Sequence, residues 1–176
     1  MIGAEQDLES PLEVQIGARL LSQGLKLAVA ESCTGGLVGH RITNVPGSSA
    51  YYLGSVTAYA YSAKERLLGV AHETLASFGA VSRETALEMA RGVRHTLEAD
   101  IGLSVTGIAG PGGGLPNKPV GLVWIALSAP GGDWSFCYLW HGSRVENKTF
   151  SAQAVLQLLM DYLSGAVPSR SSAPCD

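Results

Sequence analysis

The chain has 176 residues, of which 46% are apolar and only 15% are charged. This length and composition suit one compact domain with a sizeable core and exclude an intrinsically disordered protein. Twelve basic and 15 acidic side chains give a formal net charge of -3, without the basic excess typical of proteins that bind nucleic acid directly. No apolar run reaches the roughly 18 residues of a membrane span, and the acidic start MIGAEQDLES is unlike a signal peptide. We therefore expect a cytoplasmic protein that does not enter a membrane.

The first half of the chain alternates helical and strand patterns. Apolar spacing predicts a helix over 12–25, a short buried strand over 26–30 and a helix that starts after residue 33 and ends before Pro46. The segment 55–61, SVTAYAY, has the composition of a strand, and a short helix is predicted to follow it from Ser62.

The second half continues the alternation and adds a hairpin. It is predicted to contain, in order, an amphipathic helix over 82–100 capped by Ser82, a buried strand over 101–107, a glycine- and proline-rich loop over 108–121, an antiparallel hairpin of strands 120–128 and 134–140, and a closing helix over 150–163. Residues 1–165 are predicted to form a single domain, and the small, polar tail 166–176 is predicted to be disordered.

This order of elements predicts an α/β fold, a three-layer α/β/α sandwich whose mixed sheet includes the C-terminal hairpin. Ligands of such sheets bind beyond the carboxyl ends of the strands. Two glycine-rich segments are expected there: ESCTGG, residues 31–36, and TGIAGPGGG, residues 106–114. Glycines let backbone N–H groups come close to a ligand, so the two segments together predict a binding site.

Ser32 has two interpretations. It could be the N-cap of the following helix, or a nucleophile whose oxyanion is held by nearby backbone N–H groups of Thr34, Gly35 and Gly36. A serine nucleophile needs a base, and none of the four histidines lies in a triad-like setting. Lys64 could be that base if burial lowers its pKa towards neutrality, or it could be an ordinary solvated lysine on a helix.

Two further residues are open in the same way. Cys33 could be a rival nucleophile or a small core residue, and the small-core interpretation is favoured because no histidine partner is visible. The chain has three cysteines, an odd number without metal-like spacing, which favours free thiols. Arg144, just before the last helical pattern, could bind an anion or lie on the surface.

Six segments together resemble a known family. They are, in chain order, AESCTGGL, VPGSSAYY, AKERLLGV, ETLASFGAVS, SVTGIAGPGGG and KPVGLVWIAL, and they are similar to the C-terminal domain of the CinA family over roughly residues 10–165. Stand-alone members of that family are nicotinamide-nucleotide amidases. The resemblance implies hydrolysis of the carboxamide of nicotinamide mononucleotide, giving nicotinic acid mononucleotide and ammonia, by a serine–lysine mechanism without a metal or a cofactor.

The resemblance also implies roles for individual residues. Ser32 would be the nucleophile and Lys64 the base, while Ser49 and Tyr59 would assist orientation or proton transfer. The residues that would contact the substrate or support the oxyanion are Thr34, Gly35, Gly36, Thr106, Gly107 and Gly110, with Arg144 holding the phosphate or the reacting end. A homodimer is implied, with the small-molecule substrate rather than nucleic acid as its binding partner.

One position departs from the family pattern. The family usually reads tyrosine-x-asparagine-x-x-lysine, whereas this chain has Tyr61 in the place of the asparagine. A phenol is bulkier than an amide and could crowd the site or change how Lys64 is held. Tyr61 and the two glycine-rich loops leave open a nucleotide- or phosphate-binding module without hydrolysis. The competence-damage label of the family suggests a third function, a regulatory partner linked to DNA uptake or damage, although the lack of a basic excess argues against direct contact with DNA.

Overall fold

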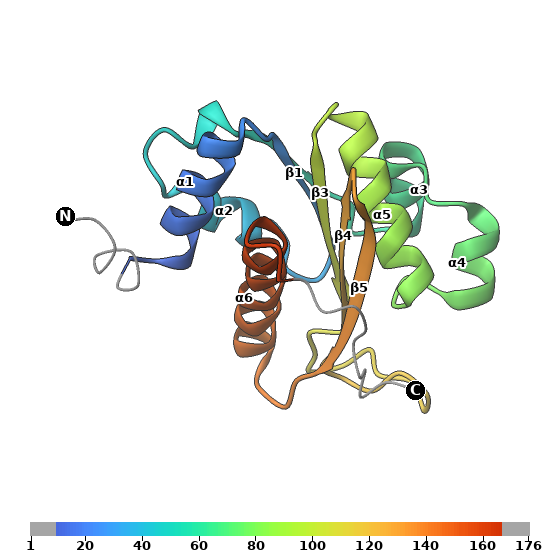
Figure 1. The fold of residues 1–176 in the computed structure, drawn as a ribbon. Coiled ribbons are helices and arrows are strands. Elements are labelled where there is room, and N and C mark those ends of the chain that lie inside the picture. Colours follow the sequence, from blue (N-terminus) through green and yellow to red (C-terminus); the bar gives the residue numbers. More distant parts are fainter. Residues whose placement is uncertain (1–9, 167–176) are drawn as a thin grey trace.

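The computed structural model describes residues 10–166 and contains one mixed five-stranded sheet (Figure 1). Its strands are β1 (Leu27–Glu31), β2 (Tyr52–Thr57), β3 (Ile101–Gly107), β4 (Leu122–Ala129) and β5 (Gly132–Leu139), in the order β2-β1-β3-β4-β5. β1 runs parallel to β2 and β3, while β4 is antiparallel to β3 and β5. The predicted mixed sheet with a C-terminal hairpin is confirmed.

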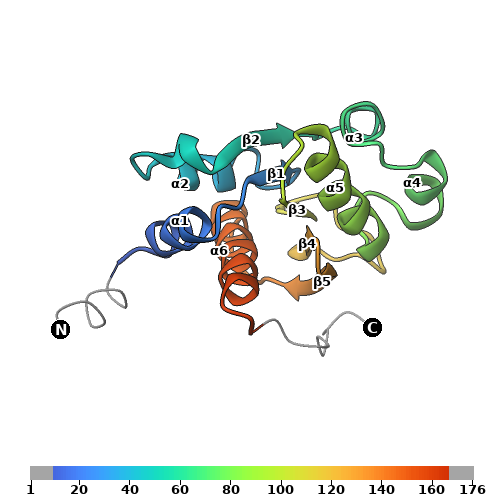
Figure 2. The same cartoon turned by 45° about the horizontal axis from the view of Figure 1, so that its top comes forward.

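Helices cover both faces of the sheet, which confirms the predicted three layers (Figures 1 and 2). One face carries α1 (Leu12–Gln23), α2 (Leu37–Thr43) and α6 (Arg144–Leu163), and the other carries α3 (Tyr61–Leu68), α4 (His72–Phe78) and α5 (Arg83–Thr96). A single 3-10 turn, η1 (Ser48–Ala50), precedes β2. No helix of residues 10–166 is both long and apolar enough to span a bilayer.

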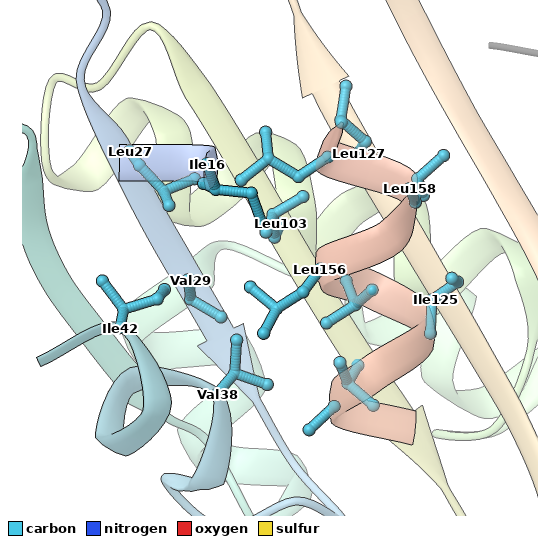
Figure 3. Close-up of a cluster of buried hydrophobic side chains, with 14 of the residues drawn as sticks. Ile16, Leu27, Val29, Val38, Ile42, Leu103, Ile125, Leu127, Leu156 and Leu158 are labelled. Atoms are coloured by element: carbon cyan, nitrogen blue, oxygen red, sulfur yellow. The ribbon is translucent and has the colours of Figure 1, made fainter. Parts of the chain in front are cut away.

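The core divides between the two faces because successive side chains of a strand point to opposite sides. Leu27 and Val29 of β1 join the larger cluster with α1, α2 and α6, part of which is drawn in Figure 3. Ala28 and Ala30 of the same strand join a smaller cluster against α3, α4 and α5. On that side α5 approaches the sheet closely, since a Cβ at Gly102 would lie only 2.1 Å from the carbonyl oxygen of Ala90.

The strand predicted over 55–61 is β2, and its position was wrong by three to four residues. β2 ends at Thr57 because its neighbour β1 ends at Glu31, the residue that pairs with Thr57. Beyond Thr57 one more backbone hydrogen bond joins this segment to β1, from the Ala58 N–H to the Glu31 carbonyl oxygen. Ala60 then becomes the N-cap of α3, which starts at Tyr61. The earlier end of the strand places Lys64 in the first turns of a helix at the sheet edge.

The bounds of the other helices and strands agree with the predictions only in part. β3 has the predicted bounds, and Ser82 caps α5 by accepting the N–H of Thr85. α6 begins at Arg144, six residues before the predicted start, because Ser143 and Glu146 form a capping box there. α4 was not predicted. Cys33 is a free thiol as expected, but Cys137 is disulfide-bonded. The tail predicted over 166–176 lies, apart from its first residue, outside the described residues.

Candidate functional site

The carboxyl ends of three parallel strands lie at one edge of the sheet, which brings distant segments together. Glu31 at the end of β1 pairs with Thr57 of β2 and Val105 of β3. The backbone after β1 is still held there, because the Ser32 N–H donates to the Val105 carbonyl oxygen at 2.9 Å. The backbone of Ser32 is therefore held in place at the end of β1, between β2 and β3, where the turn to α2 begins.

Lys64 reaches this edge from α3 and contacts Ser32 directly. Its Nζ lies 2.9 Å from the Ser32 Oγ, 2.7 Å from the carbonyl oxygen of Ala58 and 3.3 Å from that of Tyr59. Lys64 is fully buried, and Ser32 is 8% exposed. Within residues 10–166 no carboxylate lies within ion-pair distance of the lysine. Burial removes the ammonium from water and lowers the pKa of Lys64 to about 8.

A cavity of about 240 Å³ opens over this pair. Of the residues predicted for the site, the cavity brings together Ser32, Tyr59, Lys64, Thr106, Gly107, Gly110 and Arg144. These residues come from the ends of β1, β2 and β3, from α3 and from the start of α6, so the pocket exists only in the folded chain. Ala80 and Val81, which sequence reasoning did not identify, also line it.

Arg144 spans one side of the pocket. Its Nη1 donates to the carbonyl oxygen of Gly110 at 2.7 Å, and its Nη2 donates to the hydroxyl oxygen of Tyr59 at 3.0 Å. Both acceptors are neutral, so the positive charge of Arg144 has no carboxylate partner in the described part of the chain. The guanidinium has five N–H donors, and three of them remain for a ligand.

Two predicted residues near the end of β3, Thr106 and Gly110, hold the backbone around the pocket in place. Thr106 is buried, and its hydroxyl donates to the carbonyl oxygen of Ala80 at 2.6 Å. Gly110 has a φ of +86°, and a Cβ there would lie 2.5 Å from Val120 Cγ1. A larger residue at position 110 would therefore be strained and would displace the loop that accepts the Arg144 hydrogen bond.

Of the two interpretations of Ser32, the N-cap does not hold, because a different side chain caps α2. The fully buried carboxylate of Glu31 accepts the backbone N–H groups of Gly36, Val38 and Gly39 at 2.9 to 3.1 Å. It also accepts the Ser55 hydroxyl at 3.2 Å. Sequence reasoning missed Glu31, although an acidic residue at the end of an apolar buried strand was the available signal. The cap leaves the Ser32 hydroxyl free to face Lys64.

Thr34, Gly35 and Gly36 do not line the pocket. The Gly36 N–H is used by Glu31, and the Gly35 N–H donates to the Ser32 carbonyl oxygen at 3.1 Å. Thr34 is fully buried, and its hydroxyl has no hydrogen-bond partner within residues 10–166. The structure thus does not bring these three predicted substrate contacts to the site, because the Gly35 and Gly36 N–H groups are used by the Ser32 carbonyl oxygen and the Glu31 carboxylate.

Ser49 is likewise not brought to the pocket. It lies exposed in η1, which precedes β2. Because β2 begins at Tyr52 beside Leu27, the first residue of β1, η1 lies at the amino ends of the parallel strands. Ser32 and Lys64 lie at the carboxyl ends, so Ser49 is at the opposite edge of the sheet from them.

Cys33 lines the pocket beside Ser32 but is a poor nucleophile. It is 5% exposed, and burial raises the pKa of its thiol to about 12. A thiol with that pKa is almost entirely protonated at neutral pH, and the thiolate is the reactive form. The structure therefore favours the small-core interpretation of Cys33.

Tyr61, the departure from the family pattern, does not crowd the pocket. The residue is 53% exposed, and it is absent from the pocket lining. Its hydroxyl oxygen accepts the backbone N–H of Ala80 at 3.2 Å. Lys64 is held by Ser32, Ala58 and Tyr59 rather than by residue 61. Within residues 10–166, no group of three His, Cys, Asp or Glu side chains is arranged to hold a metal ion.

Curated relatives of this chain cover nearly all of it. A putative competence-damage inducible protein from Halothermothrix orenii is 51% identical over 156 residues, which are 88% of this chain and 38% of that protein. A CinA-like protein from Desulfotalea psychrophila is 48% identical over 161 residues, 92% of this chain and 38% of that protein. The chain therefore spans about two fifths of the length of the curated relatives it matches.

Solved structures show the same fold. The competence/damage inducible protein CihA from Agrobacterium tumefaciens superposes with a TM-score of 0.81 at 38% identity, covering 88% of this chain and 97% of that one. A CinA superfamily protein from Escherichia coli gives a TM-score of 0.84 at 28% identity, covering 92% and 94%. The family model described as the CinA C-terminal domain matches residues 9–163. The chain belongs to the CinA C-terminal domain family.

Proposed function

We propose that this protein is a serine–lysine amidohydrolase that converts nicotinamide mononucleotide to nicotinic acid mononucleotide and ammonia. The observation that carries the proposal is the 2.9 Å contact between Lys64 Nζ and Ser32 Oγ, in a pocket where Lys64 has no acidic partner among residues 10–166. A buried lysine of that kind is held close to its neutral form, which can accept the proton of a serine hydroxyl. Family membership supports the substrate, because the resemblance implies a nicotinamide-nucleotide amidase.

The reaction follows from this geometry in two halves. Neutral Lys64 takes the Ser32 hydroxyl proton while Oγ attacks the carbonyl carbon of the carboxamide, and a tetrahedral oxyanion forms. As the intermediate collapses, the C–N bond breaks and Lys64 returns the proton to the departing nitrogen, which leaves as ammonia. The product of this half-reaction is an ester between the nicotinoyl group and Ser32.

Water completes the second half. Lys64, neutral again, takes a proton from a water molecule that attacks the ester carbonyl. The second tetrahedral intermediate collapses, the C–Oγ bond breaks, and Ser32 regains its proton from Lys64. The carboxylate product then leaves. One lysine serves all four proton transfers because its pKa lies near the working pH.

The oxyanion and the phosphate need donors that the pocket supplies. Gly112 and Gly113 line the pocket, and their backbone N–H groups donate to no other group of residues 10–166. We assign the oxyanion to this loop, because Gly35 and Gly36 use their N–H groups elsewhere. We assign the phosphate to Arg144, whose charge lacks an acidic partner and whose three remaining donors suit phosphate oxygens.

The decisive experiment measures ammonia release from nicotinamide mononucleotide by the purified wild type, Ser32→Ala and Lys64→Ala. Matched controls are Ser22→Ala, on the exposed side of α1, and Lys26→Ala, at the amino end of β1. We expect each site variant to lose at least about a thousandfold in kcat, with both controls unchanged. A wild type that binds the nucleotide without releasing ammonia would instead indicate a binding module. Undiminished ammonia release by Ser32→Ala would overturn the proposed nucleophile.

A further inference from the structure

Two cavities adjoin each other at Val81. The catalytic pocket of about 240 Å³ is lined by Ala80 and Val81, and a second cavity of about 700 Å³ is lined by Val81 and Ser82. Val81 is the residue common to the two linings. We call residues 79–82, the segment between α4 and α5, the partition. The partition therefore forms part of the wall of both cavities.

Side chains from three elements hold the backbone of the partition in place. The Ala80 N–H donates to the Tyr61 hydroxyl of α3 at 3.2 Å, and the Ala80 carbonyl oxygen accepts the Thr106 hydroxyl of β3 at 2.6 Å. The Gly79 carbonyl oxygen accepts the hydroxyls of Ser82 and Thr85, at 3.0 and 2.8 Å. Both backbone groups of Ala80 are thus hydrogen-bonded, and Tyr61 of α3 is the partner of its N–H.

The second cavity has the chemistry of a subsite for an anionic, aromatic group. Arg83 and Lys118 supply two cations to its wall, and Glu84 supplies one carboxylate. Trp124 adds an indole, on which an aromatic base can stack. A nucleotide fragment, with a base and a phosphate, has this combination of properties.

We propose that Tyr61 is a positioning residue for substrate selection. By holding the partition at Ala80, it confines the substrate to the catalytic pocket and keeps the substrate out of the second cavity. The turnover measurements rest on the proposed amidase function. A partition that yields gives the remote end of a larger amide access to the second cavity. The residue that departs from the family pattern then acts on specificity, and it leaves the serine–lysine pair untouched.

The test compares two substrates of different size, nicotinamide mononucleotide and nicotinamide adenine dinucleotide. Val81→Ala shortens the partition side chain, and Tyr61→Phe removes only the hydroxyl that accepts the Ala80 N–H. Tyr162→Phe, a matched change on α6 away from both cavities, is the control. We expect the ratio of kcat/KM for the dinucleotide over the mononucleotide to rise about tenfold in Val81→Ala. In Tyr61→Phe it should rise about fivefold.

The pattern of constants separates positioning from general damage. In Tyr61→Phe the KM for the mononucleotide rises, while kcat stays within about twofold and the pH profile is unchanged, because Lys64 keeps its three contacts. Tyr162→Phe leaves all constants at wild-type values. An unchanged substrate ratio in both Tyr61→Phe and Val81→Ala would overturn the role of the partition.

Hydrogen exchange tests the contact without using activity. The Ala80 amide should exchange at least about fivefold faster in Tyr61→Phe, because it loses its acceptor, and at the wild-type rate in Tyr162→Phe. Unchanged exchange at Ala80 would overturn the positioning role of Tyr61. A wild type without turnover on either substrate would instead refute the proposed amidase function, and the exchange measurement would still decide whether Tyr61 holds the partition.

Discussion

The Lys64 ammonium nitrogen lies 2.9 Å from the Ser32 hydroxyl oxygen, although 32 residues separate the two in the chain. The contact exists because β1 and β2 are parallel and end together, so that Ser32 follows one strand and α3 follows the other. Lys64 is fully buried there, and its other partners are two backbone carbonyl oxygens. This environment stabilises the neutral lysine relative to the charged one and gives the pair its expected pH dependence.

Activity is expected to rise with pH until Lys64 is neutral. The base must be unprotonated, and the pKa of Lys64 is lowered to about 8 by burial. Below that value kcat/KM for nicotinamide mononucleotide should increase about tenfold per pH unit, and above it a plateau should follow. Measurement of kcat/KM from pH 6 to 9.5 checks this, with Lys64→Arg as the variant that keeps the charge but cannot act as a base. A flat profile over this range would exclude Lys64 as the base.

The same pKa predicts how stability depends on pH. In the folded protein Lys64 loses its proton near pH 8, whereas in the unfolded chain it does so near its ordinary value of 10.5. Between these values the unfolded state binds the extra proton, so the folded state gains up to about 1.4 kcal/mol per pH unit from this residue. Denaturant titrations at pH 7, 8, 9 and 10 should show the wild type gaining stability relative to Lys64→Met as pH rises. A difference between the two proteins that is constant across this range would contradict the lowered pKa.

The helices and strands that form the layers could be predicted from local sequence patterns, because each element depends mainly on residues that are neighbours in the chain. The apolar run over 101–107 becomes β3 with the same bounds, and the Ser82 cap opens α5 as expected. β2 was misplaced because its end depends on the length of β1, from which α2 and η1 separate it in the chain. The start of α6 was missed because the apolar periodicity begins after the capping box at Ser143.

The residues of the site that follow directly from local sequence patterns were predicted, and those that depend on distant contacts were missed. The order of helices and strands along the chain and the composition of the loops were enough to predict that Ser32, Lys64 and Thr106 meet at one edge, and they all line the pocket. Ala80 and Val81 were missed because they follow α4, which was not predicted, and because the hydrogen bonds that hold Ala80 come from Thr106 and Tyr61, which are distant in the chain. The parallel arrangement of β1 and β2 also explains Ser49, since a residue that precedes β2 enters the sheet at the opposite edge.

Cys33 should be dispensable for catalysis. Its thiol is buried, and its pKa of about 12 leaves almost no thiolate at neutral pH. We expect Cys33→Ala to retain kcat within about fivefold and to lose about 1 kcal/mol of unfolding free energy through the lost packing. The native wild type should also resist alkylation by iodoacetamide at pH 7.5, and an unfolded sample provides the positive control. Rapid alkylation of Cys33 that runs in parallel with loss of activity would reopen the thiol as the nucleophile.

Glu31 is expected to stabilise the turn that carries Ser32. Its carboxylate accepts the N–H groups of Gly36, Val38 and Gly39, and a glutamine in its place directs an NH₂ donor at one or more of these donors. Glu31→Gln should therefore lower the unfolding free energy by about 1–3 kcal/mol. Chemical denaturation measures the loss, and Glu73→Gln on the exposed surface of α4 is the control. Equal stabilities for Glu31→Gln and the control would show that the cap contributes nothing.

Tyr59 and Arg144 should act as a unit on the substrate. The Arg144 Nη2 donates to the Tyr59 hydroxyl at 3.0 Å, so removal of either partner frees the other to move. We expect Tyr59→Phe and Arg144→Ala each to raise the KM for nicotinamide mononucleotide, with the larger rise in Arg144→Ala because the phosphate loses its cation. The double variant should be less impaired than the product of the two single effects, with a coupling energy of about 0.5–3 kcal/mol.

The control for this cycle pairs Arg144→Ala with Tyr162→Phe, which lies near the other end of α6 and does not line the pocket. That pair should be additive within about 0.5 kcal/mol, because the two residues share no partner among residues 10–166. Nicotinamide riboside, which lacks the phosphate, provides the second comparison. If Arg144 binds the phosphate, Arg144→Ala changes kcat/KM for the riboside much less than for the mononucleotide. An equal loss on both substrates would move Arg144 from the phosphate to the reacting end, where the guanidinium would instead stabilise the oxyanion.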